Sequence, residues 1–128
     1  MISKPICAFV LSAALVSICA VPLASAGGAK VDGNWSMTAV TTHGHCGTIP
    51  IGMGITGGRI HSTDGSFAFY SIQLGGRVSS SGSVSLKAIA GPRIAHGTGH
   101  FSSVRGRGSW SGRGPSGLCS GVWSAERS

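Results

Sequence analysis

The sequence predicts an all-β domain: a small antiparallel up-and-down β-barrel or sandwich of about eight strands with one disulfide. Three observations predict this fold. Short runs alternate apolar and polar residues between turn residues, a pattern typical of strands. All 22 glycines lie after residue 26, among dense Ser and Thr. No segment sustains a helical apolar period with good helix formers, so the elements are strands rather than helices.

The clearest strands show strict alternation. Trp35, Met37 and Ala39 share one face of an opening strand, and residues 49–55 and 84–90 alternate in the same way. Between such runs, glycine supplies the positive φ that tight turns require. We expect turns at Gly57-Gly58, Asp64-Gly65, Gly75-Gly76, Ser81-Gly82 and Gly91-Pro92.

A faint internal repeat is also present. "GRIHSTDGSF" at 58–67 and "GRVSSSGSV" at 76–84 share one pattern, and "GHFSSVRGRGSW" at 99–110 is a looser third copy. Each copy predicts a hairpin with a serine–glycine tip. The alternative is convergent turn chemistry, and the unequal spacing argues against a repeat solenoid.

The first 26 residues predict a signal peptide. Lys4 is followed by an uncharged apolar run at 6–21 and by Ala24-Ser25-Ala26, small residues that a signal peptidase reads. We expect cleavage after Ala26 and one exported domain at 27–128, secreted or periplasmic. A membrane anchor is the alternative, but the run is short for a bilayer span, so we expect no transmembrane segment after cleavage.

Cys46 and Cys119 are the cysteines that remain after cleavage. In an oxidising compartment such a pair forms a disulfide, which for a loop of this length adds about 4 kcal/mol of stability. Cys46 ends the first strand region and Cys119 begins the last. Only an even strand number brings those two ends together in a closed barrel. We therefore expect eight strands, with a short segment such as 59–63 or 77–80 absorbed into a loop or bulge.

Two stretches resemble known families. "DGNW" at 32–35, with Trp35 on the first strand and Arg127 just after the last, resembles the signature of the calycins: lipocalins, avidins and bacterial protease inhibitors. That resemblance implies that Arg127 covers Trp35, and that the protein is a protease inhibitor or small-ligand carrier. "GSWSGRGPSGLCSGVWSAER" at 108–127 is similar to small exported proteins of rhizobia-like bacteria, some labelled haem-utilisation or adhesion proteins. No haem motif accompanies it, because "CxxCH" is absent.

The stretch "THGHCGT" suggests a metal site. His43 and His45 would share one face of a strand about 6.7 Å apart, and imidazole suits zinc or copper. A tetrahedral zinc site needs three or four ligands, and the disulfide removes Cys46. We therefore expect no metal and no cofactor. A periplasmic transition-metal-binding protein that uses His43 and His45 is the alternative.

The sequence contains matches to catalytic motifs, but none has the structural context that the chemistry needs. "GMGITG" at 52–57 and "GLCSG" at 117–121 match a dinucleotide fingerprint and a nucleophile elbow, but both lack the strand-to-helix context. The three carboxylates, Asp32, Asp64 and Glu126, are spread along the chain, whereas a glycosidase needs two facing one bond. We expect that the protein is not an enzyme.

Basic residues are the strongest functional signal. Ten Lys and Arg stand against three Asp and Glu, and Arg105, Arg107 and Arg113 surround Trp110. In a cytosolic protein this pattern would suggest single-stranded nucleic acid, but export argues against nucleic acid. The sequence predicts a non-catalytic binding protein whose partner is an anionic glycan, a lipid headgroup or an acidic protein. The alternative is that these arginines only keep the domain soluble.

Overall fold

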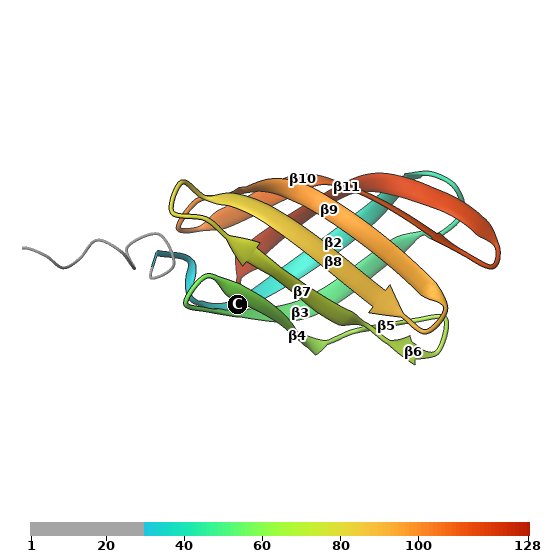
Figure 1. Cartoon of the computed structure of the whole chain (residues 1–128), viewed down its shortest axis with the longest axis horizontal. Helices are drawn as coiled ribbons and strands as arrows, with labels where there is room; N and C mark the ends of the chain where they lie inside the picture. Colours follow the sequence, from blue (N-terminus) through green and yellow to red (C-terminus); the bar gives the residue numbers. More distant parts are fainter. Residues whose placement is uncertain (1–29) are drawn as a thin grey trace, which may run out of the picture.

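The structure is a computed structural model that describes residues 30–128, so the predicted signal peptide lies outside the described part of the chain. Eight antiparallel strands form a closed barrel in the order β10–β11–β2–β3–β4–β7–β8–β9, which confirms the predicted fold and strand number (Figure 1). The barrel strands are β2 Gly33–His43, β3 Thr48–Thr56, β4 Arg59–Asp64, β7 Gln73–Val78, β8 Ser83–Ala90, β9 Arg93–Phe101, β10 Arg105–Gly114 and β11 Gly117–Arg127. A separate hairpin consists of β5 Ser66–Phe67 and β6 Tyr70–Ser71.

Alternate side chains on each strand point into the barrel, as the period of two requires. Trp35, Met37 and Ala39 are all buried, which confirms the predicted inner face of β2. Strands β3 and β8 behave in the same way, with residues such as Met53 and Leu86 inside. The apolar interior, rather than any helix, is therefore what stabilises the fold.

Both ends of the described chain lie at the same end of the barrel (Figure 1). Large buried side chains fill this end. Trp35 is buried, and its indole N–H donates a hydrogen bond of 2.8 Å to the carbonyl of Val31, just before β2. The Phe101 ring meets Trp35 edge-on, with 4.9 Å between ring centroids, and it also packs on Trp123. These rings close this end, which we call the closed end.

Arg127 covers the closed end from outside. Its guanidinium lies 4.7 Å from the centroid of the Trp35 ring. The same side chain donates hydrogen bonds to the carbonyl oxygens of Ser103 (2.6 Å), Asp32 (2.8 Å) and Lys30. One arginine thus joins the chain before β2 to the β9–β10 turn.

Glycines on the inner face of β9 and β10 make room for the aromatic rings. A Cβ added at Gly108 would lie 1.9 Å from the carbonyl oxygen of Thr98 and 2.7 Å from the indole nitrogen of Trp123. A Cβ at Gly106 would lie 2.6 Å from the Phe101 ring. The Arg-Gly alternation of β10 therefore means arginine outside and glycine inside.

Cys46, in the β2–β3 loop, is bonded to Cys119 on β11, with 6.2 Å between Cα atoms, which confirms the predicted disulfide. Because His43 on β2 pairs with Ser120 on β11, the disulfide lies where the first and last barrel strands meet. It lies at the end opposite the closed end (Figure 1).

Three local expectations are wrong. Residues 59–63 are barrel strand, although β4 pairs with β3 through a register shift, and 77–80 is strand as far as Val78 and leaves the sheet only after it. The segment outside the barrel is the β5–β6 hairpin instead. Gly75-Gly76 is not a turn but lies inside β7, where a Cβ on Gly76 would lie 2.2 Å from the carbonyl oxygen of Ser85 on β8. This close approach explains the glycine. The first repeat copy is not a hairpin, because β4 pairs with β3 and β7.

Candidate functional site

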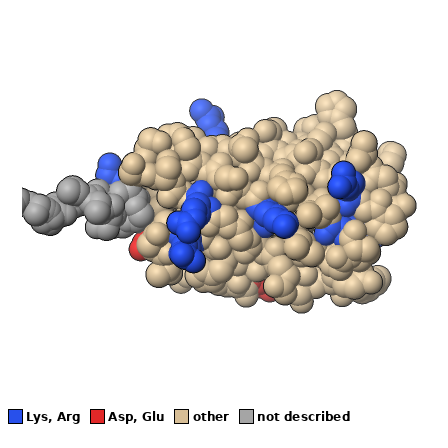
Figure 2. Space-filling view, viewed as in Figure 1, with Lys and Arg blue, Asp and Glu red and all other residues tan. Residues whose placement is uncertain are grey.

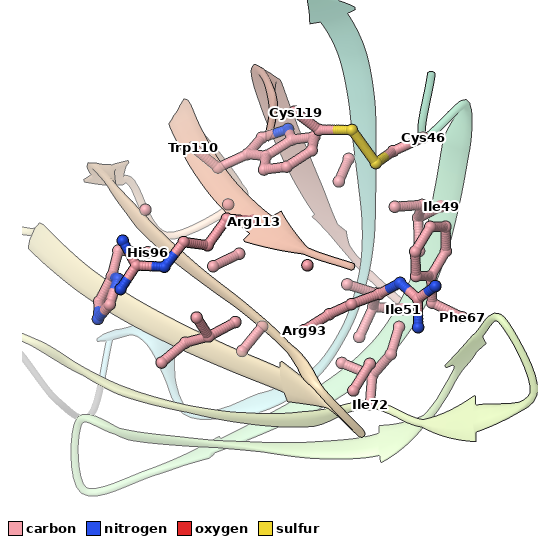
Figure 3. A pocket seen from close by; sticks show the side chains of 18 of the residues that line it. Cys46, Ile49, Ile51, Phe67, Ile72, Arg93, His96, Trp110, Arg113 and Cys119 are labelled. Atoms are coloured by element: carbon pink, nitrogen blue, oxygen red, sulfur yellow. A yellow bond between two sulfur atoms is a disulfide. The ribbon is translucent and has the colours of Figure 1, made fainter. Parts of the chain in front are cut away.

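The barrel contains an apolar cavity of about 120 Å³ at the end opposite the closed end (Figure 3). Aliphatic side chains from β2, β3, β7 and β8 line it, together with the indoles of Trp110 and Trp123 and the Cys46–Cys119 disulfide. Its rim includes residues next to the β8–β9 and β10–β11 turns, such as Arg93 and Ser116. We call this end the open end.

Small inward side chains create the cavity. Ala39, Ala88 and Ala95 line it from β2, β8 and β9, and Gly97 and Gly112 line it from β9 and β10. The closed half instead holds Trp35, Phe101 and Met53, the largest fully buried side chains. An eight-stranded barrel is just wide enough for its own side chains or one small ligand. The change from large to small residues therefore leaves space in one half only.

Phe67 and Arg93 lie together at one side of the mouth. The Arg93 guanidinium carbon is 5.5 Å from the centroid of the Phe67 ring, within the range of a cation–π contact. In Figure 3 this pair lies on the same side of the opening as Cys46 and Ile49, whereas His96 and Arg113 lie across from it. The lining at the mouth therefore combines an aromatic ring and the disulfide with two arginines, Arg93 and Arg113.

The residues of the predicted arginine cluster lie on both faces of β10: the arginines are on the outer face and Trp110 is at an inward position. Arg105, Arg107 and Arg113 are exposed on the outer face of β10, which confirms that Arg105 and Arg107 share a face. Trp110 occupies an inward position on the same strand and lines the cavity, where its N–H donates to the carbonyl of Val122 (3.2 Å). The structure therefore separates Trp110 from Arg105 and Arg107, whereas Arg113 also lines the cavity, at its rim.

His43 and His45 are both exposed, at the end of β2 and in the loop that follows. His43 Nδ1 lies 3.2 Å from the hydroxyl of Thr42. Within residues 30–128, no three His, Cys, Asp or Glu side chains lie together in a way that could hold a metal ion. The structure supplies no third ligand from the described chain to this histidine pair, and metal binding stays a prediction.

The three carboxylates lie in different parts of the barrel. Asp32 accepts hydrogen bonds from the backbone N–H groups of Gly57 and Gly58, at 2.9 and 3.3 Å, and so fixes the β3–β4 turn. Glu126 faces Arg105 across β11 and β10, and Asp64 faces Gly52 across β4 and β3. None of the three lines the cavity.

Sequence reasoning missed the cavity, together with Phe67 and Arg93 at its mouth. A signal was present, because the alternation that placed Ala39, Ala88 and Ala90 inside also placed very small side chains there. Phe67 had no such signal, since the sequence predicts one hairpin over 58–67 and does not indicate the separate β5–β6 hairpin.

Fold and site together define a closed eight-stranded barrel with one filled half and one hollow half. A solved structure described as a redesigned β-barrel is similar, with a TM-score of 0.57 and 12% sequence identity over 80% of this chain and 96% of that one. This likeness shows the barrel fold alone. No protein-family model matches the sequence, and no curated protein matches it. Within residues 30–128, no helix is long and apolar enough to cross a membrane.

Proposed function

We propose that this protein is an exported, non-catalytic binding protein that holds a small apolar molecule in its barrel. The observation that carries the proposal is the cavity of about 120 Å³ lined by aliphatic and indole side chains. An apolar cavity of about 150 Å³ in another protein stays dry and binds benzene, so a single aromatic ring or a short alkyl group is the appropriate size. The disulfide is compatible with a secreted or periplasmic location.

Toluene is a suitable probe, because it is apolar and of this size. Trp110 and Trp123 line the cavity, so we expect saturable changes in tryptophan emission and a rise in Tm with toluene concentration. The variant Ala88→Leu adds a larger side chain to the cavity wall. It should remove both responses and change the unfolding free energy by about 1 kcal/mol or less, because it fills existing space.

The matched control is Ser85→Leu, the same new side chain at an outward position of the same strand. It should keep the full toluene response. A toluene affinity that is equal in Ala88→Leu and the parent protein, or no response in the parent, would disprove binding in the cavity.

A second candidate is binding of an anionic partner along β10. Arg105 and Arg107 project from one outer face of this strand, which favours an anion-attracting strip. Retention on a sulfated glycan matrix should fall with salt and should weaken in Arg105→Ala and Arg107→Ala. Retention that is independent of salt would count against this candidate.

A further inference from the structure

The open end presents large apolar side chains to solvent. Phe69, at the tip of the β5–β6 hairpin, is fully exposed, and Leu118, beside the β10–β11 turn, is 76% exposed. Tyr70 is 47% exposed next to Phe69, with its ring close to the Gly91 turn. These turns project together at the right-hand end of Figure 1. The exposed groups therefore surround the cavity mouth on separate tips.

Phe69 has an unfavourable backbone conformation, and its side chain makes no packing contact in the barrel that would offset the strain. Ala68 and Phe69 have φ values of 51° and 71°, where glycine or asparagine is the usual residue of a two-residue hairpin turn. Strain of this kind persists only where the surrounding structure holds the backbone in place, and such residues cluster at functional sites. Because the Phe69 ring is fully exposed, packing within the barrel does not offset this strain.

The charge of this end is positive. Arg93 and Arg113 flank the β8–β9 and β10–β11 turns, and none of the open-end segments 43–48, 66–71, 89–96 and 112–120 contains an acidic residue. Figure 2 shows basic side chains at the right-hand end, with the visible acidic atoms placed away from it. A second copy of this end would meet like charge, so self-association through it is disfavoured.

We propose that the open end docks on an anionic lipid surface. Phe69, Tyr70 and Leu118 enter the boundary between headgroups and acyl chains, and Arg93 and Arg113 contact phosphate groups. Protruding apolar tips with a basic rim fit a soft interface better than a flat partner surface, and binding of this type combines apolar burial with attraction to anionic lipid. Docking would also turn the cavity mouth toward the bilayer, although it does not depend on the cavity having a ligand.

The test is sedimentation with vesicles of phosphatidylcholine alone or mixed equally with phosphatidylglycerol, using protein recovered after export with its N-terminus verified by mass. We expect binding to the anionic vesicles only. Replacing both Phe69 and Leu118 with Ser should lower the partition coefficient by about tenfold or more, because their apolar burial is lost. Val40→Ser with Val122→Ser, an exposed apolar pair on the barrel side, is the matched control and should bind normally.

Three further variants make the outcome decisive. Arg113→Gln should weaken binding about fivefold. Arg107→Gln, on the same outer face of β10 but about 20 Å nearer the closed end, should have little effect at 0.15 M salt, where charges are screened over about 8 Å. Phe69→Gly removes the ring and the strain together, so weaker binding by a folded, oxidised variant cannot be due to unfolding.

Several results would overturn the proposal. These are no binding to anionic vesicles, equal loss with Arg107→Gln and Arg113→Gln, or normal binding by the Phe69 and Leu118 double variant. Concentration-dependent dimerisation that the same double variant abolishes would assign the open end to a second copy of the chain instead. Failure of the toluene experiment would leave this proposal intact, because the two use different residues.

Discussion

At the scale of single residues, Arg127 connects several parts of the closed end. Arg127→Ala removes three hydrogen bonds to carbonyl groups and the contact with the Trp35 ring. These groups are partly solvated, so we expect a loss of about 2 kcal/mol in the free energy of unfolding, measured by urea denaturation. Arg127→Lys should recover only part of it, because an ammonium group lacks the planar fork that reaches several carbonyls.

Arg105→Ala is the control for this prediction, since Arg105 is exposed near the same end of the barrel. It should change stability by about 0.5 kcal/mol or less. Equal effects at Arg105 and Arg127 would mean that net charge, rather than the contacts of Arg127, determines stability. The contact between Arg127 and Trp35 is the one that the calycin resemblance implies, while membership of that group stays a prediction.

At the scale of elements, the β5–β6 hairpin is strained at its tip. Phe69→Gly should raise the unfolding free energy by about 0.5–1 kcal/mol, because relief of the left-handed conformation exceeds the greater unfolded-state entropy of glycine. Phe67→Ala, in the same hairpin, should lower it, since Phe67 packs against the core. Urea denaturation distinguishes the two, and a destabilised Phe69→Gly would show that the exposed ring supports the fold.

Strand β10 gives the opposite case, a glycine whose replacement by a larger residue is expected to lower stability. Gly108→Ala would place a methyl group against the Thr98 carbonyl and the Trp123 indole, so we expect a loss of about 2–3 kcal/mol in urea denaturation. Ser109→Ala, the next residue and outward-facing, should be nearly neutral. A neutral Gly108→Ala would mean that β9 and β10 separate easily and that the packing of Trp123 is loose.

These elements also show where sequence reasoning works and where it ends. Residues such as Trp35 and Met37 are predictable because apolar side chains alternate with polar ones on β2. Gly75-Gly76 misled because a glycine that admits a neighbouring backbone has the same letters as one that turns the chain. The small inward residues were visible in the sequence, but the cavity itself was not predictable from them, because its volume depends on side chains from seven barrel strands meeting in one barrel half.

At the scale of the whole molecule, barrel closure and the disulfide are one feature. An even number of antiparallel strands places the end of β2 beside the start of β11, and Cys46 and Cys119 lie at that junction. The disulfide therefore lies beside the same two strands, β2 and β11, whose backbone hydrogen bonds complete the barrel. That relation followed from the positions of two cysteines and the parity of the strand count.

The double variant Cys46→Ala/Cys119→Ala tests how much stability the covalent closure contributes. The two cysteines are 73 residues apart, for which the loss of unfolded-chain entropy corresponds to about 4 kcal/mol. Either single replacement should cost nearly as much as the double one, because each breaks the same bond. For a domain of typical stability this is a large fraction of the total, so the variant should unfold at much lower urea concentration while keeping its strand content by circular dichroism. A loss of only about 1 kcal/mol would mean that the unfolded chain already holds β2 near β11 without the bond, as residual structure in denatured proteins allows.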